Sequence, residues 1–249
     1  LVFMGIAAYM TLKGLFGQWR ASWLDPVAIN LADWGWKDQS LATALARATG
    51  MAPGTALLAA AALLAAGLLV FVFIDRRFRG NAAQGGVAVA IGALVVAGWY
   101  LSGHLGYGEN PETLEHVYVA TNSRTVESMS FVGPMAYSLE LLMLWTDKSL
   151  RVTFGIASVV GVVLGSAAYA LASKRFRWEG FASLADLRNQ LVGALLMGFG
   201  GVTALGCTIG QGLSGISTLA IGSFIALAGI IAGSVAALKY TLWREERGA

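Results

Sequence analysis

The residues best suited to chemistry lie in one glycine-rich stretch, GFGGVTALGCTIGQGLSG, at positions 198–215. It contains Cys207, the only cysteine in the chain, inside an apolar segment. A thiol offers a weak S–H donor and a polarizable sulfur, which together suit a soft, sulfur-bearing anion. Because a thiolate would repel an anion, we expect Cys207 to act as the neutral thiol. The alternative is that Cys207 is a small apolar side chain packed in a core.

The residues around this cysteine disfavour a continuous helix. Glycines alternate there with polar side chains, and this combination leaves backbone amides to be satisfied by something other than the helix. At membrane depth such backbone is tolerated only when it is buried in protein or lines a cavity. We therefore expect a discontinuous helix at a substrate site, whereas the alternative is close packing of helices through small residues. The binding residues expected here are Gly206, Cys207, Thr208, Gly210, Gln211 and Gly212.

A second short motif, SFVGP at 130–134, could supply the other half of that site. Gly133 followed by Pro134 is typical of a helix start, because proline at the first helical position lacks only an amide proton that would be unpaired anyway. If Ser130 and Phe131 dip into the membrane in extended form, the N-terminus of the helix faces the interior and favours an anion. We count these four residues as binding candidates. The alternative is an external helix that lies flat on the membrane.

Other ionisable residues give weaker indications. Glu140 follows the second motif, and its nearness to Lys148 and the expected outer surface favours a side chain that extends to water. His104 and His116 flank a polar loop without carboxylates or cysteines at metal-ligand spacing. We expect no metal, no cofactor and no enzymatic nucleophile–base pair.

The elements that must position these residues are membrane helices. The chain is 57% hydrophobic and only 12% charged, far from the roughly 25% charged residues of soluble domains. No apolar window alternates with the two-residue period of an outer-membrane strand. The fold class is therefore all-α, a polytopic integral membrane protein. The net charge is only +3, and the basic residues form short clusters between apolar segments. We therefore expect no nucleic-acid partner and expect the chain to contact the lipid bilayer.

Apolar windows predict the spans. Full crossings are expected at 56–74, 86–105 and 152–172, with a broken hairpin over 191–238. The run at 1–16 is interpreted as the remainder of a span whose start precedes the sequence. The segment 131–146 is too short to cross a hydrocarbon core of about 30 Å. We expect it to be a re-entrant helix.

Basic clusters set the orientation. Lysine and arginine concentrate at 75–79, 174–177 and 239–247, whereas the loop at 106–130 carries several glutamates. Short loops rich in lysine and arginine are typically cytoplasmic. The three clusters are then cytoplasmic and the loop is external, provided that 131–146 does not span.

Three segments carry a resemblance to a known family: SFVGP, LGSAAYALASKRFRWEGF and GALLMGFGGVTALGCTIGQGLSGISTLAIGSFIALAGIIAG. They are similar to the YeeE/YedE family of sulfur-compound transporters. The resemblance implies a multi-pass protein of the bacterial inner membrane with inverted pseudo-repeats, short helices that dip in from both faces, and cysteines that relay an anion. Cys207 matches the cysteine of the C-terminal half.

This resemblance also implies a domain organisation. Residues 1–249 form a single transmembrane domain, in which 1–80 is the remainder of the N-terminal half and 81–249 is the C-terminal half. The glycine–cysteine motif of the first half is absent from the sequence, and we expect it in a segment upstream of Leu1.

The leading functional hypothesis is a transporter that takes up thiosulfate or a related inorganic sulfur anion through a cysteine-lined constriction. The first alternative is a membrane subunit that docks a small cytoplasmic TusA-like sulfur-carrier protein. The second is a membrane sulfurtransferase that carries a persulfide on Cys207. Accessibility of the thiol separates them, since a carrier thiol must be reachable by a soluble partner.

Overall fold

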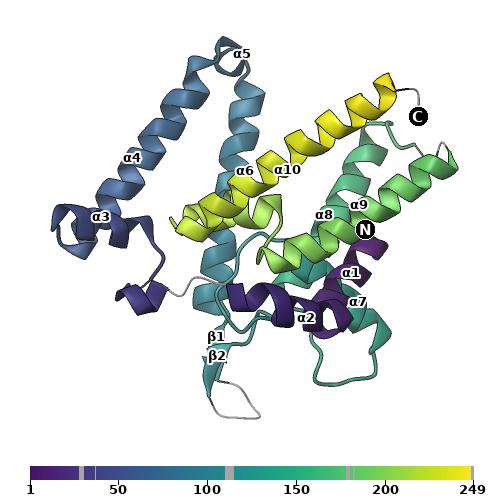
Figure 1. Cartoon of the computed structure of the whole chain (residues 1–249), viewed down its shortest axis with the longest axis horizontal. Helices are drawn as coiled ribbons and strands as arrows, with labels where there is room; N and C mark the ends of the chain where they lie inside the picture. Colours follow the sequence, from purple (N-terminus) through teal and green to yellow (C-terminus); the bar gives the residue numbers. More distant parts are fainter. Residues whose placement is uncertain (28–30, 37, 110–114, 178–179, 182, 248–249) are drawn as a thin grey trace. The chain divides into compact units, whose positions relative to one another are not determined.

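A computed structural model describes residues 1–249 except 28–30, 37, 110–114, 178–179, 182 and 248–249. The described chain is mostly helical, as predicted, with two short strands (Figure 1). Its α-helices are α1 (Val2–Lys13), α2 (Leu15–Trp19), α3 (Leu41–Thr49), α4 (Pro53–Ile74), α5 (Arg76–Arg79), α6 (Ala82–Tyr100), α7 (Val132–Met143), α8 (Phe154–Ala172), α9 (Leu184–Thr203) and α10 (Ile221–Glu246). Short 3-10 or π turns are η1 (Arg20–Leu24), η2 (Asp25–Val27), η3 (Leu31–Trp34), η4 (Leu101–Leu105) and η5 (Gly210–Gly215), and the strands are β1 (Tyr107–Glu109) and β2 (His116–Tyr118).

Four described helices are long and apolar enough to cross a membrane. They are α4, α6 continued through η4, α8 and α10. The first three confirm the spans expected at 56–74, 86–105 and 152–172 within a few residues. The protein is therefore an all-α, multi-pass membrane protein.

The helices that flank the glycine-rich motif begin and end elsewhere than expected. α9 begins at Leu184 instead of residue 191, because the Ser183 hydroxyl caps it by accepting the Asp186 amide at 3.1 Å. α10 begins at Ile221 and continues to Glu246. Residues 239–246 of the basic cluster thus form the last turns of α10, and Arg247 is its C-cap residue.

The chain divides into two compact units. The first comprises Leu1–Ala28 and Gly92–Gly210, and the second comprises Ile29–Ile91 and Gln211–Ala249. The division passes through α6 and through the glycine-rich motif.

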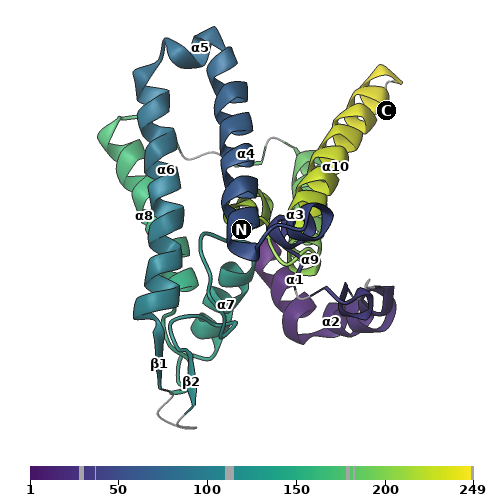
Figure 2. The same cartoon turned by 90° about the vertical axis from the view of Figure 1, so that its left-hand side faces the viewer.

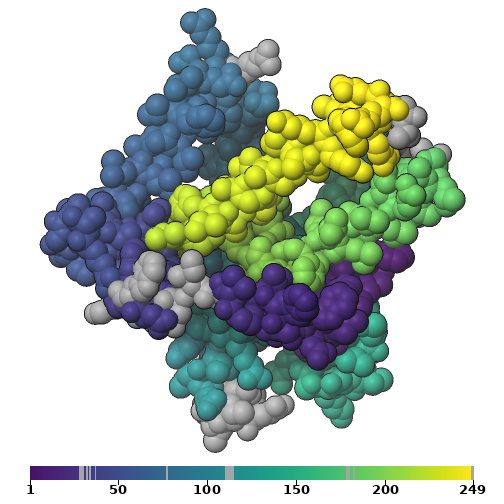
Figure 3. Space-filling view, in the orientation of Figure 1, coloured from purple at the N-terminus to yellow at the C-terminus, as the bar shows by residue number. Residues whose placement is uncertain are grey.

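In the first unit, α1 packs against both α7 and α9 (Figure 1). The core there joins Met4 and Ala8 of α1, Val132 and Ala136 of α7, and Val202 of α9. The space-filling view shows α1 and α2, in purple, lying directly along the green α9 (Figure 3). Close approach is required at Gly198 of α9, where a Cβ atom would lie 2.4 Å from the Met4 carbonyl oxygen.

The segment between α6 and α7 is tied to its neighbouring helices by polar bonds. β1 and β2 form an antiparallel hairpin that follows α6 (Figure 2). The Ser128 hydroxyl donates to the Val95 carbonyl of α6 at 2.7 Å, and the Phe154 amide of α8 donates to the Ala120 carbonyl at 2.9 Å. Burial raises the pKa of the Glu127 carboxyl in the same segment, although bonds from Ser123 partly offset this. This loop therefore has a defined path beside α6 and α8.

In the second unit, the segment before α10 pairs with the segment before α3. Ser40 and Ala220 form an isolated antiparallel bridge, supported by bonds from the Leu41 amide to the Leu219 carbonyl (2.9 Å) and from the Ile221 amide to the Gln39 carbonyl (2.8 Å). The Ser40 hydroxyl also caps α3 by accepting the Ala42 amide. These bonds fix where α10 begins.

Candidate functional site

The candidate site begins where α9 is stopped by its own backbone. The Gly206 amide donates to the Gly201 carbonyl at 2.8 Å, and the Leu205 amide donates to the Val202 carbonyl at 3.0 Å. These two bonds form a Schellman motif, in which the residue after the C-cap takes a left-handed conformation. That residue is Leu205, with a φ of +57°. Leu205 thus occupies a left-handed position that normally favours glycine. Its backbone is therefore strained, two residues before Cys207.

Cys207 immediately precedes the next helical segment. After Leu205 and Gly206 the chain is non-helical at Cys207 and becomes helical again from 208 to 217, with π-type bonding over Gly210–Gly215. The expected discontinuity of the helix is confirmed. The motif is nevertheless wound and not open, because glycine adapts to the wider π-type turn.

The Cys207 side chain caps this turn. Its Sγ accepts the Gly210 amide at 3.5 Å, three residues along, which is the position of an N-cap acceptor. The sequence predicted a thiol that donates, and the structure adds that the sulfur also accepts. Because accepting uses a sulfur lone pair, the S–H proton remains available for another partner.

The second motif meets the first at Gly210. A Cβ built on Gly210 would lie 2.9 Å from the Ser130 Oγ and 3.9 Å from the Cys207 Sγ. Val132, two residues after Ser130, belongs to the core cluster against which Cys207 packs. Residues 130–132 and 207–210 are therefore neighbours within the first unit. That they form two halves of one binding site stays a prediction.

The N-terminus of α7 lies at this junction without a side-chain cap. α7 begins at Val132, with Phe131 as its N-cap residue, and no hydrogen bond from a side chain caps it in the described structure. Pro134 is thus the third helical residue and not the first, which corrects the expectation. The proline still fits, because the first four amides of a helix have no partner within it.

The remaining predicted residues lie in different surroundings. Gly206 is buried, Thr208 is exposed, and Gly133 has open space where a Cβ would lie. Pro134 packs against Gly155 of α8, where a Cβ would lie 2.7 Å from its ring. Gln211 and Gly212 belong to the second unit. Their roles as binding residues stay predictions.

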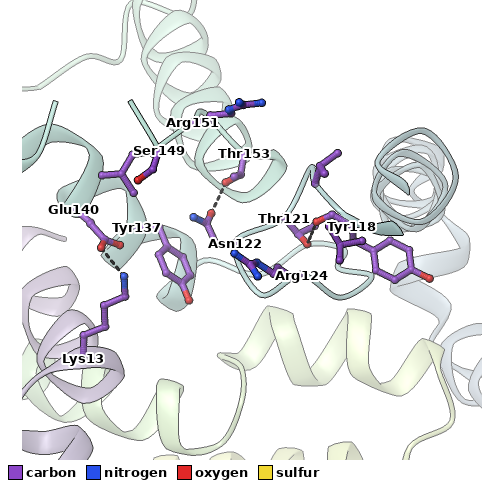
Figure 4. Close-up of a pocket in the computed structure, with 13 residues that line it drawn as sticks. Lys13, Tyr118, Thr121, Asn122, Arg124, Tyr137, Glu140, Ser149, Arg151 and Thr153 are labelled. Atoms are coloured by element: carbon purple, nitrogen blue, oxygen red, sulfur yellow. Dashed lines mark hydrogen bonds and ion pairs between the residues drawn. The ribbon is translucent and has the colours of Figure 1, made fainter. Parts of the chain in front are cut away.

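A polar cavity of about 360 Å³ borders the other end of α7. Its lining draws on α1, α7, β2 with the segment after it, and the segment before α8 (Figure 4). The labelled polar residues include Lys13, Asn122, Arg124, Tyr137, Glu140, Ser149, Arg151 and Thr153. Sequence reasoning missed this cavity, because its residues come together only through tertiary packing.

Glu140 corrects a further expectation. It does not extend to water: it is 5% exposed, and its Oε1 accepts the Lys13 Nζ at 2.6 Å and the Tyr9 hydroxyl at 3.4 Å. Burial of a carboxylate requires such a partner. The partner lies 127 residues away in the sequence, and no local pattern indicates it.

The histidines occupy aromatic contacts. His104 packs on Tyr100 with ring centroids 5.2 Å apart, and His116 stacks on Tyr107 at 5.6 Å. Within the residues that the structure describes, no group of three or more histidine, cysteine, aspartate or glutamate side chains could hold a metal ion.

Comparison with known proteins identifies the family. A family model described as sulphur transport matches residues 1–236. The thiosulfate transporter TsuA of Escherichia coli (strain K12) is 32% identical over 121 residues, which are 49% of this chain and 34% of that protein. The thiosulfate transporter TsuA of Spirochaeta thermophila is 36% identical over 76 residues, 30% of this chain and 23% of that protein. Each aligned segment thus covers only a minority of the relative. From the match over nearly its whole length, the chain belongs to the sulphur transport family, the YeeE/YedE family that its motifs resemble.

Proposed function

We propose that this protein takes up thiosulfate or a related inorganic sulfur anion through a constriction at Cys207. The observation that carries the proposal is the meeting of Ser130 and Cys207 at Gly210, where the uncapped α7 and the turn capped by Cys207 both begin. Family membership and the two thiosulfate transporters among its relatives support the choice of substrate.

The chemistry of the junction matches that of thiosulfate. The anion has one terminal sulfur and three oxygens, so it presents a soft end and a hard end. A neutral thiol at Cys207 donates its weak S–H to the soft sulfur. The hydroxyl of Ser130 and the free amides of α7 suit the oxygens, and the positive ends of helix dipoles favour the negative charge.

The finer assignments belong to the same proposal. The protein would lie in the bacterial inner membrane, with its basic clusters in the cytoplasm. A TusA-like sulfur carrier would receive the imported sulfur there. Division into an N-terminal half up to residue 80 and a C-terminal half from residue 81 is the organisation that we expect for the path. An enzymatic role on Cys207 is not part of this proposal.

Uptake by purified protein tests the proposal. Proteoliposomes that contain the protein should accumulate labelled thiosulfate in a saturable manner, and empty liposomes should not. Gly210→Leu should block uptake, because even a Cβ at this position lies 2.9 Å from Ser130. Gly161→Leu is the matched control, since Gly161 of α8 has no atom within 4 Å of its Cβ position. Absence of saturable uptake by the unmodified protein would overturn the proposal.

A further inference from the structure

An ion pair joins α1 to α7 at the end of α7 farthest from Cys207. The Lys13 Nζ lies 2.6 Å from the Glu140 Oε1, and the two side chains are 51% and 6% exposed, respectively. The Tyr9 hydroxyl adds a longer bond of 3.4 Å to the same oxygen. In the described structure the side-chain bonds of Glu140 thus come from α1, although Glu140 lies on α7.

This pair adds a short, charged contact to the apolar packing between the two helices. The apolar contacts place flexible side chains, Met135 and Leu139 of α7, against Gly5 of α1. Between membrane helices such contacts gain no hydrophobic driving force, and polar bonds add specificity. Next to its contact with α1, Glu140 borders the polar cavity together with Tyr137 (Figure 4). A charge-assisted bond therefore sets the position of α7 along α1.

The two ends of α7 are mechanically linked. Glu140 follows Val132 by eight residues, which is roughly 12 Å along a helix. Val132 lies in the cluster that contacts Cys207, and its neighbour Ser130 lies against Gly210. A shift of α7 at Glu140 is transmitted to this junction because a short helix moves as a rigid rod.

We propose that Lys13 and Glu140 form a positioning pair, which holds α7 so that Ser130 stays against Gly210 and Cys207. The pair touches no substrate. It acts through α7 on the geometry of the junction. The inference rests on the proposed function only for its effect on uptake, since the position of α7 can be measured without any substrate.

The rate at which Cys207 is alkylated reports the position of α7, because residues 130–132 lie next to Cys207. Cys207 is the only cysteine in the sequence, and its modification by a small neutral maleimide can be followed by the mass of the peptide that contains it. Lys13→Met should raise the alkylation rate about tenfold or more, the change that accompanies loss of one hydrogen bond to a charged group. Glu140→Gln should have a smaller effect, because the half-exposed Lys13 can then hydrate, whereas Lys13→Met strands a buried carboxylate.

The exchange of both charges is the decisive variant. Lys13→Glu combined with Glu140→Lys rebuilds the pair and should return the alkylation rate to within about threefold of the unmodified protein, which a general loss of stability would not permit. Lys148→Met, at an exposed position before α8, is the control and should leave the rate unchanged.

Uptake provides the second readout. Lys13→Met should raise the KM for thiosulfate, and the exchanged pair should restore it. If Lys13→Met does not accumulate in membranes, Glu140→Gln and the exchanged pair carry the test. An unchanged alkylation rate in folded Glu140→Gln and Lys13→Met, or failure of the exchange to restore it, would overturn the inference. Absence of uptake in every form with the expected alkylation pattern would instead refute the proposed function alone.

Discussion

Replacing Cys207 with alanine removes two interactions at once. The Gly210 amide loses the sulfur that caps it at 3.5 Å, and under the proposed function a passing anion would lose the S–H donor. Loss of an N-cap acceptor costs about 0.5–2 kcal/mol, and the weak acceptor strength of sulfur places Cys207 near the lower value. Loss of a donor in a water-poor constriction costs about 1–3 kcal/mol, or roughly ten- to hundredfold in affinity. We expect uptake to collapse while the protein still folds.

Serine at this position separates the two roles. Cys207→Ser retains an oxygen that caps the Gly210 amide better than sulfur does, but it loses the soft donor that suits a sulfur atom. If capping were the whole function, Cys207→Ser would match the unmodified protein. We expect intermediate uptake, above that of Cys207→Ala and below normal.

Growth provides the assay. A strain that depends on this protein for thiosulfate as sole sulfur source should fail to grow with Cys207→Ala and grow slowly with Cys207→Ser. Membrane expression of each variant is measured alongside. Normal growth with Cys207→Ala at normal expression would refute the reasoning and would leave the thiol as a small packed side chain.

Three further predictions concern packing, strain and topology. Gly198→Val should lower the free energy of unfolding by about 1–3 kcal/mol, since its Cβ would lie 2.4 Å from a backbone oxygen, whereas Gly193→Ala, in open space, should not; equal thermal unfolding of the two would contradict the packing of α1 on α9. Leu205→Gly should raise that free energy by about 0.5–1 kcal/mol, because it relieves a left-handed leucine, and an unchanged unfolding temperature would exclude stored strain there. Reporter fusions at Gly80 and Gly180 should give cytoplasmic signals and a fusion between β2 and α7 an external one, and an external signal at Gly180 would show that α7 spans.

Features that depend on local composition were predictable from the sequence. Length and hydropathy placed α4, α6 and α8, because a span must bury every backbone group inside one apolar run. An interruption of the helix near Cys207 was predictable from the glycines, although the chain is helical again from 208 to 217. The sequence also suggested that the SFVGP motif lies near the Cys207 motif, because it reads as a helix start that faces the membrane interior.

Features that depend on distant partners were not predictable. A lysine in the last turn of α1 is ordinary by itself, and only tertiary packing brings Lys13 to Glu140. The start of α9 at Leu184 was missed because its first turns carry Asp186 and Arg188, which hydropathy excludes from a span although Ser183 caps a helix there. The capping role of Cys207 was missed because sequence preferences for N-caps favour oxygen acceptors.

The choice of a thiol as cap has a consequence for a site that must release its ligand. Asparagine, aspartate, serine or threonine would satisfy the Gly210 amide more completely and would stabilise the turn. A sulfur at 3.5 Å satisfies it weakly, and the adjoining Leu205 adds strain. The turn at Gly210 is therefore less stable than a helix start could be. Under the proposed function, an anion oxygen would compete for the amide without displacing a strong cap. If this is the design, replacing the thiol by the strongest cap, in Cys207→Asp, should stabilise the turn and abolish uptake together, because the carboxylate both holds the amide and repels the anion.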